Sequence, residues 1–386
     1  MLKITPIAYP GAPQDVLKRG ESILKNKLGI IDFEFTDINL DALFIITGGS
    51  ESKARNILKN VDRILILAMT ENNSYAAASE IKAYCNKNNI KSILYNIDNE
   101  ANIDNKLEMY SKCNIALNNI LKYKVGLIGE VSEWLINSEI SDEILKTKLG
   151  IQLEKIAWSE FSNYSEFALN DEFIEHFKDS ELDIKDSSKV YNLLTDIITK
   201  KQLSAITVEC FPLVREHAVT ACLALSRFNT NGIPAGCEGD ITSITGKIIV
   251  KELTGQIPWM ANLAAVEDEI VFFAHCTIAT DLVDDFKINT HFETNQGTAI
   301  HGKFKSEEVT VFRLNKDLTK AFLSYGEIIE RPEREDSCRT QIKVKIPFND
   351  VEKLKENPLG NHHLIVPGDH RDLIQFFLKF IKIEIV

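Results

Sequence analysis

The chain has 386 residues, and at about 150 residues per domain this length predicts two or three domains. It carries 44 Lys and Arg against 56 Asp and Glu, a formal net charge of −12 at pH 7. Nucleic acids and anionic membrane surfaces attract clustered positive charge, so this balance disfavours both as main partners. Hydrophobic side chains make up 44% of the chain, which excludes wholesale disorder.

The cysteines and the amino-terminal segment indicate the cellular compartment in which the protein works. The seven cysteines are scattered, odd in number and never spaced as a CxxC pair. This pattern argues against a disulfide scaffold or a zinc ribbon and is typical of a reducing compartment. The opening residues, MLKITPIAYPGAP, soon become polar and contain prolines, unlike a signal peptide, and no apolar run approaches the roughly 18 residues of a membrane span. We therefore expect a cytoplasmic protein with no membrane partner.

The first third of the chain alternates short apolar runs with amphipathic helical patterns, which predicts crossover units and a parallel sheet. The turns TGGS (47–50) and TENNS (70–74) follow two of the strands, at the edge where open α/β sheets bind ligands. Helix capping by Ser50 and Ser74 would explain the same turns without a ligand. The predicted strands are 43–47, 63–69, 92–97 and 124–130, and the predicted helices are 51–60, 74–87 and 102–121.

A second α/β stretch follows, and the remainder of the chain changes character. Segments 298–304, 307–315 and 339–347 alternate polar and apolar side chains with period two, as half-buried antiparallel strands do. A last apolar segment, LIQFFLKFIKIEIV, is compatible with a helix or a strand. In the second stretch the predicted helices are 133–145, 181–201, a buried one from about Pro212 to Phe228, and 241–254, and the predicted strands are 204–210 and 269–276.

Acidic side chains end two of the predicted strands. Glu209 lies at the carboxyl end of 204–210, and Glu238 lies 29 residues further on, about one strand–helix–strand unit. The two carboxylates should therefore end neighbouring parallel strands and project into one crevice. His275 ends the strand 269–276 after about one more unit, so we expect an imidazole at a third adjacent strand end.

Neighbouring carboxylates repel each other unless a cation or a shared proton offsets their charge. Mixed oxygen and nitrogen ligands suit Mn²⁺, Co²⁺ or Mg²⁺ better than thiolate-preferring metals. The segment GNHHLIVPGDH (360–370) offers further imidazoles, of which His362 and His363 precede a strand-like run. These residue types predict a divalent-cation site.

Other interpretations of these residues stay open. Asp240 stands directly before the helix 241–254, where an N-cap alone explains it. His275 could be a hydrogen-bonded structural residue, and His362 and His363 could lie in a loop. Three cysteines adjoin the site candidates, and because adjacent strand residues face opposite ways, only one of the two sets should line the crevice. These cysteines are Cys210, Cys237 and Cys276.

The chain resembles the superfamily of L-fucose isomerase and L-arabinose isomerase, especially its shorter members. The segments AGCEGDITSITG (235–246) and GNHHLIVPGD (360–369) carry the most specific part of the resemblance. It implies an α/β fold: two Rossmann-like parallel-sheet domains, 1–122 and 123–275, and a mostly antiparallel, β-barrel-like domain, 276–386. It also implies a homo-oligomer, a trimer or hexamer, with active sites near subunit contacts. The other matching segments are 72–84, 124–136, 209–213, 274–279, 291–304 and 338–347.

The resemblance further implies a divalent-metal-dependent aldose–ketose isomerase, usually with Mn²⁺, that converts a small sugar through an enediolate. Glu209 and Glu238 would be the acid and base and also metal ligands, with His362 as the carboxyl-terminal ligand. A non-catalytic sugar-binding or regulatory protein of the same fold is the alternative. The chain is shorter than the typical members, so the sugar cannot be carried over, and an anionic substituent would need a cation such as Arg215 or Arg313. Asp240, His363 and His275 are the further candidate ligands.

Overall fold

The computed structural model describes residues 1–29 and 32–386 and contains two compact units. The first unit comprises 1–115 with 379–381, and the second comprises 116–378 with 382–386. Parallel sheets occur in both units and a mostly antiparallel sheet in the second, so the predicted α/β fold class is confirmed. The division into three domains stays a prediction. Among the described residues, none of the helices combines the length and apolar content that crossing a membrane requires.

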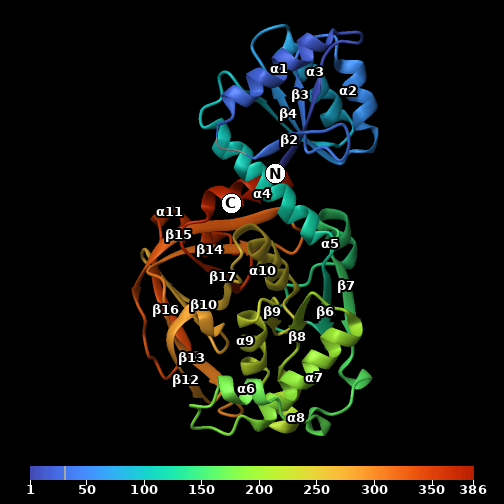
Figure 1. Ribbon diagram of the computed structural model, residues 1–386. Coiled ribbons are helices and arrows are strands. Elements are labelled where there is room, and N and C mark those ends of the chain that lie inside the picture. Colours follow the sequence, from blue (N-terminus) through green and yellow to red (C-terminus); the bar gives the residue numbers. More distant parts are fainter. Residues whose placement is uncertain (30–31) are drawn as a thin grey trace. The chain divides into compact units, whose positions relative to one another are not determined.

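The first unit is built on a five-stranded parallel sheet with strand order β2-β1-β3-β4-β5 and helices packed around it (Figure 1). Side chains such as Leu43, Ile45 and Ile66 are fully buried between the sheet and its helices. The alternating pattern therefore predicted three strands of this sheet correctly, but it missed two, and the expected strand 124–130 belongs to the parallel sheet of the second unit. Its strands are β1 (Leu2–Ile7), β2 (Phe33–Phe35), β3 (Ala42–Ile45), β4 (Arg63–Ala68) and β5 (Lys91–Asn96); the helices are α1 (Gln14–Lys27), α2 (Glu51–Ile57), α3 (Ser74–Lys87) and α4 (Ile103–Ile120), the last of which extends into the second unit.

The expected helix capping by Ser50 and Ser74 was wrong. The Ser50 hydroxyl donates to the carbonyl of Thr47 and bonds no amide of α2. Asn73 precedes α3 with a left-handed φ of 55°, and this leaves Ser74 inside the first turn. There its hydroxyl accepts from the amide of Met69 and donates to the carbonyl of Ile45, joining two strand ends.

The second unit contains a four-stranded parallel sheet with strand order β7-β6-β8-β9. The register pairs Val208 with Cys237, so Glu209 and Glu238 follow neighbouring strands as predicted. The strands are β6 (Lys124–Ile128), β7 (Gln152–Ile156), β8 (Ala205–Val208) and β9 (Ala235–Cys237), and the helices are α5 (Asp142–Leu149), α6 (Asp171–His176), α7 (Lys185–Lys201), α8 (Phe211–His217), α9 (Cys222–Thr230) and α10 (Ile241–Thr254).

Two predicted helices of this unit were wrong. Residues 133–140 form turns, and α5 begins only after Ser141, whose hydroxyl accepts from the amide of Ile144. The helix expected from Pro212 to Phe228 is broken into α8 and α9. Ala218 has a φ of 58° at the break, and the nearby Thr220 hydroxyl exchanges hydrogen bonds with the main chain of Thr298. Tertiary contacts thus override the helical pattern at both places.

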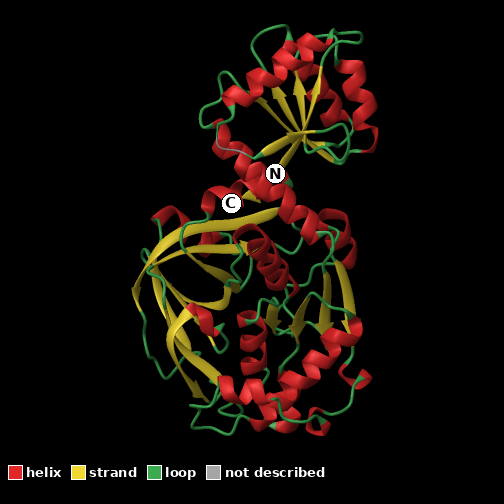
Figure 2. Cartoon of the chain, in the orientation of Figure 1, coloured by secondary structure: helices red, strands yellow, loops and turns green. Residues whose placement is uncertain are grey.

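Most of the remaining strands close into a barrel. Six of them, β14-β17-β10-β11-β16-β15, pair in antiparallel order, and β15 pairs back onto β14 (Figure 2). The strand that ends in His275 is β11 of this barrel, so the expectation that it extends the parallel sheet was wrong. The strands are β10 (Trp259–Glu267), β11 (Ile270–His275), β14 (Glu308–Leu314), β15 (Lys320–Glu330), β16 (Thr340–Lys345) and β17 (His362–Pro367); β12 (Val283–Asn289) and β13 (Ala299–Phe304) form a hairpin, β18 (Glu384–Ile385) pairs with β15, and two helices, α11 (Phe348–Glu356) and α12 (Arg371–Phe380), complete the chain.

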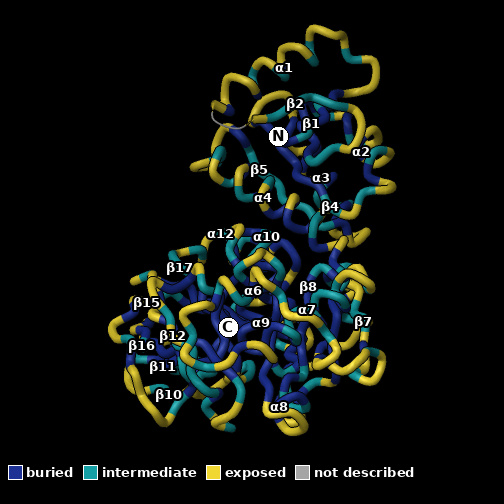
Figure 3. Tube along the Cα trace, turned by 60° about the horizontal axis from the view of Figure 1, so that its bottom comes forward, coloured by how far each residue is buried: buried dark blue, intermediate teal, exposed yellow. Residues whose placement is uncertain are grey.

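Helices α9 and α10 lie between the parallel sheet and the barrel strands (Figure 1). Nearly every residue of both helices is buried (Figure 3). As predicted, Gly255 ends α10, with a φ of 76° that suits glycine. The two sheets therefore meet across α10, and Asp240, which begins this helix, lies near the carboxyl end of β9.

Lys247 is a buried cation on α10. Its ammonium contacts Asn229 Oδ1 at 3.3 Å, and burial lowers its pKa to about 8, although the nearby Cys237 opposes the shift. The unfolded lysine titrates near 10.5, so burying the charged ammonium lowers the free energy of unfolding. This cost is largest below pH 8 and disappears as the pH rises to 10.5. We expect Lys247→Met to raise the free energy of unfolding at pH 7 by up to about 3 kcal/mol. Urea denaturation at several pH values checks this, and a gain that persists above pH 10.5 would contradict it.

Candidate functional site

Glu238, His275 and His362 form the centre of the candidate site. One ligand atom of each residue lies within 4.8 Å of the others. The three residues come from three different strand ends: Glu238 follows β9, His275 ends β11 and His362 begins β17. The site therefore requires both the parallel sheet and the barrel to be in place.

His362 is oriented by Asp240. Its Nδ1 lies 2.9 Å from Asp240 Oδ2. Its Nε2 is buried 3.7 Å from Glu238 Oε1 and has no hydrogen-bond partner among residues 1–29 and 32–386. Burial lowers the pKa of His362, but the two carboxylates outweigh it and raise the pKa to about 9. Asp240 also caps α10, since its carboxylate accepts from the amide and the hydroxyl of Ser243. The N-cap interpretation of Asp240 is thus confirmed, and the same side chain fixes a candidate ligand.

Glu238 adopts a left-handed backbone conformation, with a φ of 62° that is uncommon for a residue with a side chain. Its carbonyl accepts from the amide of Ser132 at 2.9 Å, and its Oε2 accepts from the indole N–H of Trp134 at 2.6 Å. Burial raises the pKa of Glu238, but the interactions with His362, His275 and Trp134 outweigh it and hold the pKa at about 2. The carboxylate is therefore charged and held by neighbours on two sides.

His275 is buried beside His362, with ring centroids 5.5 Å apart, and its Nδ1 lies 3.3 Å from the amide of Thr277. Burial and the neighbouring His362 lower its pKa to about 3, so the ring is neutral. A neutral imidazole is the form that binds a metal. His275 reaches the centre from the barrel rather than from a third parallel strand.

Glu209 lies beside this centre without belonging to it. Its Oε2 accepts from the amide of Glu130 at 2.9 Å, while its Oε1 accepts no hydrogen bond from the part of the chain that the structure describes. Its main-chain carbonyl accepts from the indole of Trp158 at 3.3 Å. A side chain on Gly129 would place its Cβ 2.5 Å from Glu209 Oε2, so this glycine makes room for the carboxylate.

Gly129→Ala should therefore destabilise the protein more than a matched substitution elsewhere. Gly129 has a φ of 80°, and Gly232 has a φ of 81° but would place a Cβ in open space, with no atom within 4 Å. The left-handed backbone alone costs alanine about 1–2 kcal/mol, and only Gly129→Ala adds a collision with Glu209. Chemical denaturation of both variants measures the difference, and equal losses would contradict the proposed crowding.

The other sequence candidates lie outside the centre. His363 points to the opposite face of β17, where it packs against Phe273 and Phe322, and its Nδ1 lies 2.8 Å from the carbonyl of Asn361. Burial, with a smaller effect of Arg313, lowers its pKa to about 3. The seven cysteines are free and buried, and the three that adjoin the site form no metal-holding group among the described residues.

The two arginines that could recognise an anionic sugar differ in availability. Arg313 is buried, donates to the carbonyl of His362 and to Ser138 Oγ, and lies 3.9 Å from Asp240 Oδ2. It is thus engaged in holding the site together. Arg215 is exposed on α8, the helix that begins two residues after Glu209.

Sequence reasoning missed three neighbours of Glu238. Trp134 bonds its carboxylate, while the charge of Glu238 affects the pKa values of His291 and Glu293. Burial lowers the pKa of His291 and raises that of Glu293, and Glu238 opposes the first shift and adds to the second. None of the three directly ends a predicted strand that carries an acid or an imidazole at its carboxyl end, so the strand-end argument did not find them. The matching segments 124–136 and 291–304 contain them.

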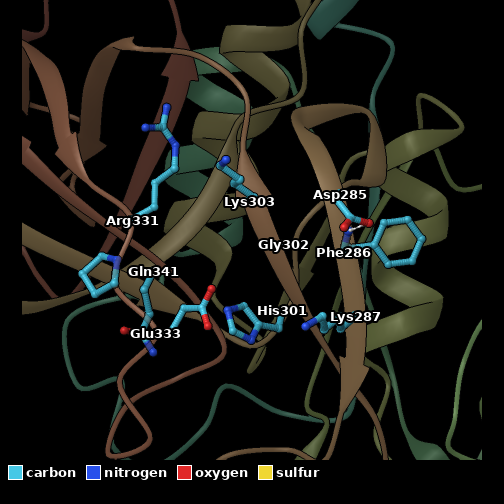
Figure 4. Close-up of a pocket in the computed structure, with 10 residues that line it drawn as sticks. Asp285, Phe286, Lys287, His301, Gly302, Lys303, Arg331, Glu333 and Gln341 are labelled. Carbon is cyan, nitrogen blue, oxygen red and sulfur yellow. Dashed lines mark hydrogen bonds between the residues drawn. The ribbon is translucent and has the colours of Figure 1, made fainter.

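A cavity of about 410 Å³ lies elsewhere on the second unit, between the β12–β13 hairpin and residues 331–333 (Figure 4). Lys287 and Lys303 from the hairpin line it together with Asp285 and Glu333. The opposite charges offset each other, and the nearby Arg331 already binds Glu307 and two main-chain carbonyls. We assign no role to this cavity.

The residues at the centre fit a divalent cation. The unpartnered Nε2 of His362 faces a carboxylate oxygen of Glu238, and His275 adds a second imidazole. This mixed set of nitrogen and oxygen donors is typical of borderline divalent metals. The fold and the site together define an α/β protein with a candidate metal centre between a parallel sheet and a barrel.

Comparisons with known proteins give matches to part of the chain. No protein-family model matches the sequence. The chain is 26% identical over 210 residues to sulfoquinovose isomerases of Priestia aryabhattai and of Priestia megaterium. Each match covers 50% of this chain and 47% of the relative, so the chain spans about half the length of the curated relatives it matches.

Proposed function

We propose that the protein is a divalent-metal-dependent aldose–ketose isomerase that acts on a small sugar. The observation that carries this proposal is the group formed by Glu238, His275 and His362, with Glu209 at the adjacent strand end. The similarity to two sulfoquinovose isomerases supports the reaction class. Membership in the fucose and arabinose isomerase superfamily belongs to the same proposal.

Glu238, His275 and His362 would hold the cation, and Mn²⁺ is the proposed ion, with Co²⁺ or Mg²⁺ as alternatives. When bound, a divalent cation polarises a sugar carbonyl and stabilises negative charge that develops on its oxygen. Asp240 keeps Nε2 of His362 directed at the centre through its bond to Nδ1. Such outer partners fix the orientation of a ligating imidazole.

Glu209 is proposed as the base that moves a proton between C2 and C1 of the sugar, with Glu238 as the second carboxylate of the pair. The amide of Glu130 fixes one oxygen of Glu209 and leaves the other for proton transfer. A carboxylate in this position needs only to reach the carbon-bound proton in the complex with sugar. Substitution of Glu209 tests whether its carboxylate also contacts the cation.

The remaining proposals concern the substrate and the assembly. The relatives are sulfoquinovose isomerases. Of the two candidate arginines, we propose the exposed Arg215 for an anionic substituent, because Arg313 is already engaged. We further propose a homotrimer or homohexamer with the site near subunit contacts, a three-domain chain and a cytoplasmic location. Neither nucleic acid nor membrane is a proposed partner.

An isomerase assay tests the proposal directly. Metal-stripped protein is reloaded with Mn²⁺ and given a panel of aldoses that includes sulfoquinovose, and ketose formation is followed by chromatography. We expect turnover that depends on added metal. No conversion of any sugar, together with no metal binding above background, would overturn the proposal.

A further inference from the structure

We propose that Trp134 is a positioning residue for Glu238 and that its exposed ring is an aromatic wall of the sugar site. The first part stands on the hydrogen-bond geometry, and the second rests on the proposed function. Trp134 lies in the loop that follows β6, far in sequence from the residue it holds.

The loop that contains Trp134 packs directly against the backbone around Glu238. The amide of Ser132 donates to the carbonyl of Glu238, and the indole of Trp134 donates to its carboxylate. A side chain on Gly239 would collide with the backbone of Glu130 and Val131, so the two segments are in close contact. One loop therefore fixes both the main chain and the side chain of Glu238.

The indole hydrogen bond gives the two carboxylate oxygens of Glu238 different contacts. Oε2 accepts from Trp134 at 2.6 Å, while Oε1 faces Nε2 of His362 at 3.7 Å. The indole is a donor only, so it cannot itself ligate a cation, and it prevents the carboxylate from rotating about its last bond. Oε1 is thereby kept as the oxygen that is directed at the metal group.

Trp134 also has the features of a contact surface for a sugar. Its ring packs edge-on against Phe211 at a centroid distance of 4.7 Å, and Phe211 packs against His291 at 5.9 Å. Despite these contacts Trp134 remains 46% exposed beside a charged, polar centre. An aromatic face with a polar N–H suits a ligand that has both C–H and hydroxyl groups.

Nuclear magnetic resonance tests the positioning role without metal or sugar. The chain has three tryptophans, so ¹⁵N-labelled indoles give three N–H signals, and Trp134→Phe assigns the one of interest. Glu238→Gln should shift the Trp134 signal and leave that of Trp259, whose N–H is bonded to the carbonyl of Thr277, in place. A Trp134 signal that does not move would overturn the positioning role.

Metal and sugar binding separate the two parts. Trp134→Phe keeps a ring but loses the N–H, and we expect Mn²⁺ affinity to fall about tenfold or more with little change in sugar KM. Trp134→Ala should lower Mn²⁺ affinity similarly and also raise KM about tenfold. Ile136→Ala, on the same loop at a side chain that is 88% exposed, is the control that should match the wild type.

The outcomes distinguish this inference from the proposed function. Wild-type Mn²⁺ affinity in Trp134→Phe would overturn the positioning role, and equal KM values in the two Trp134 variants would overturn the aromatic wall. Trp134-dependent Mn²⁺ binding without conversion or binding of any sugar would refute the isomerase and the wall but support the positioning role. If the wild type binds no Mn²⁺, the indole shift alone decides the positioning role.

Discussion

Glu238→Gln is expected to abolish tight Mn²⁺ binding and, with it, any isomerase activity. Glutamine keeps the size of the side chain and can still accept from Trp134, but it removes the only negative charge in the group of Glu238, His275 and His362. Substitution of residues that merely support a metal ligand costs 10–100-fold in affinity, so loss of a charged ligand should cost at least about 100-fold. Isothermal titration with Mn²⁺ measures this directly.

Thermal unfolding gives an independent readout of the same variant. A ligand that binds only the folded state raises its stability by about 2.7 kcal/mol at a concentration of 100 times Kd. Added Mn²⁺ should therefore raise the Tm of the wild type and of Glu216→Gln, whose carboxylate is exposed on α8, but not that of Glu238→Gln. For Asp240→Asn we expect a Mn²⁺-induced rise in Tm between those of the wild type and Glu238→Gln. This substitution weakens the hydrogen bond that orients His362 but removes none of the three proposed metal ligands. An unchanged Mn²⁺ response in Glu238→Gln would contradict the assignment of this centre.

Part of the fold could be predicted from local patterns, because buried parallel strands such as β3, β4 and β8 carry apolar runs of their own. Two of the barrel strands, β14 and β16, were visible through their period of two. The pattern was misleading where distant segments intervene. Residues 133–140 are turns because this loop is bonded to the segment around Glu238: the carbonyl of Ser138 accepts from the amide of Thr242. The helix from Pro212 is broken where Thr220 bonds Thr298. Such contacts leave no periodic trace in the sequence.

The candidate site, like the fold, could be predicted from the sequence only in part. Glu209 and Glu238 could be placed together because parallel strands end at one edge, and the register confirms their adjacency. The choice between His362 and His363 could not be made, since it depends on which face of β17 meets α10 and the centre. His275 was selected for the wrong topological reason, because β11 pairs in the barrel. Trp134 was missed because an indole in a loop has no spacing rule.

Glu209→Gln should separate catalysis from binding. The side chain lies outside the group that would hold the cation, so we expect Mn²⁺ affinity to fall much less than in Glu238→Gln. The amide of glutamine retains an oxygen that can accept from Glu130, which keeps the local structure, but it cannot take up a proton from carbon. Loss of a general base typically lowers the rate by about 10²–10⁴-fold, and we expect kcat to fall in that range with sugar affinity retained.

Three measurements on this variant discriminate between the roles of Glu209. A fall in Mn²⁺ affinity as large as in Glu238→Gln would make Glu209 a metal ligand rather than a base alone. Unchanged kcat would exclude it from proton transfer, and the carboxylate of Glu238 would then have to act alone. If the wild type binds sugar without turnover and Glu209→Gln binds it equally well, a sugar-binding protein of the same fold is favoured. Such a protein needs the centre for affinity but does not need a carboxylate that only moves protons.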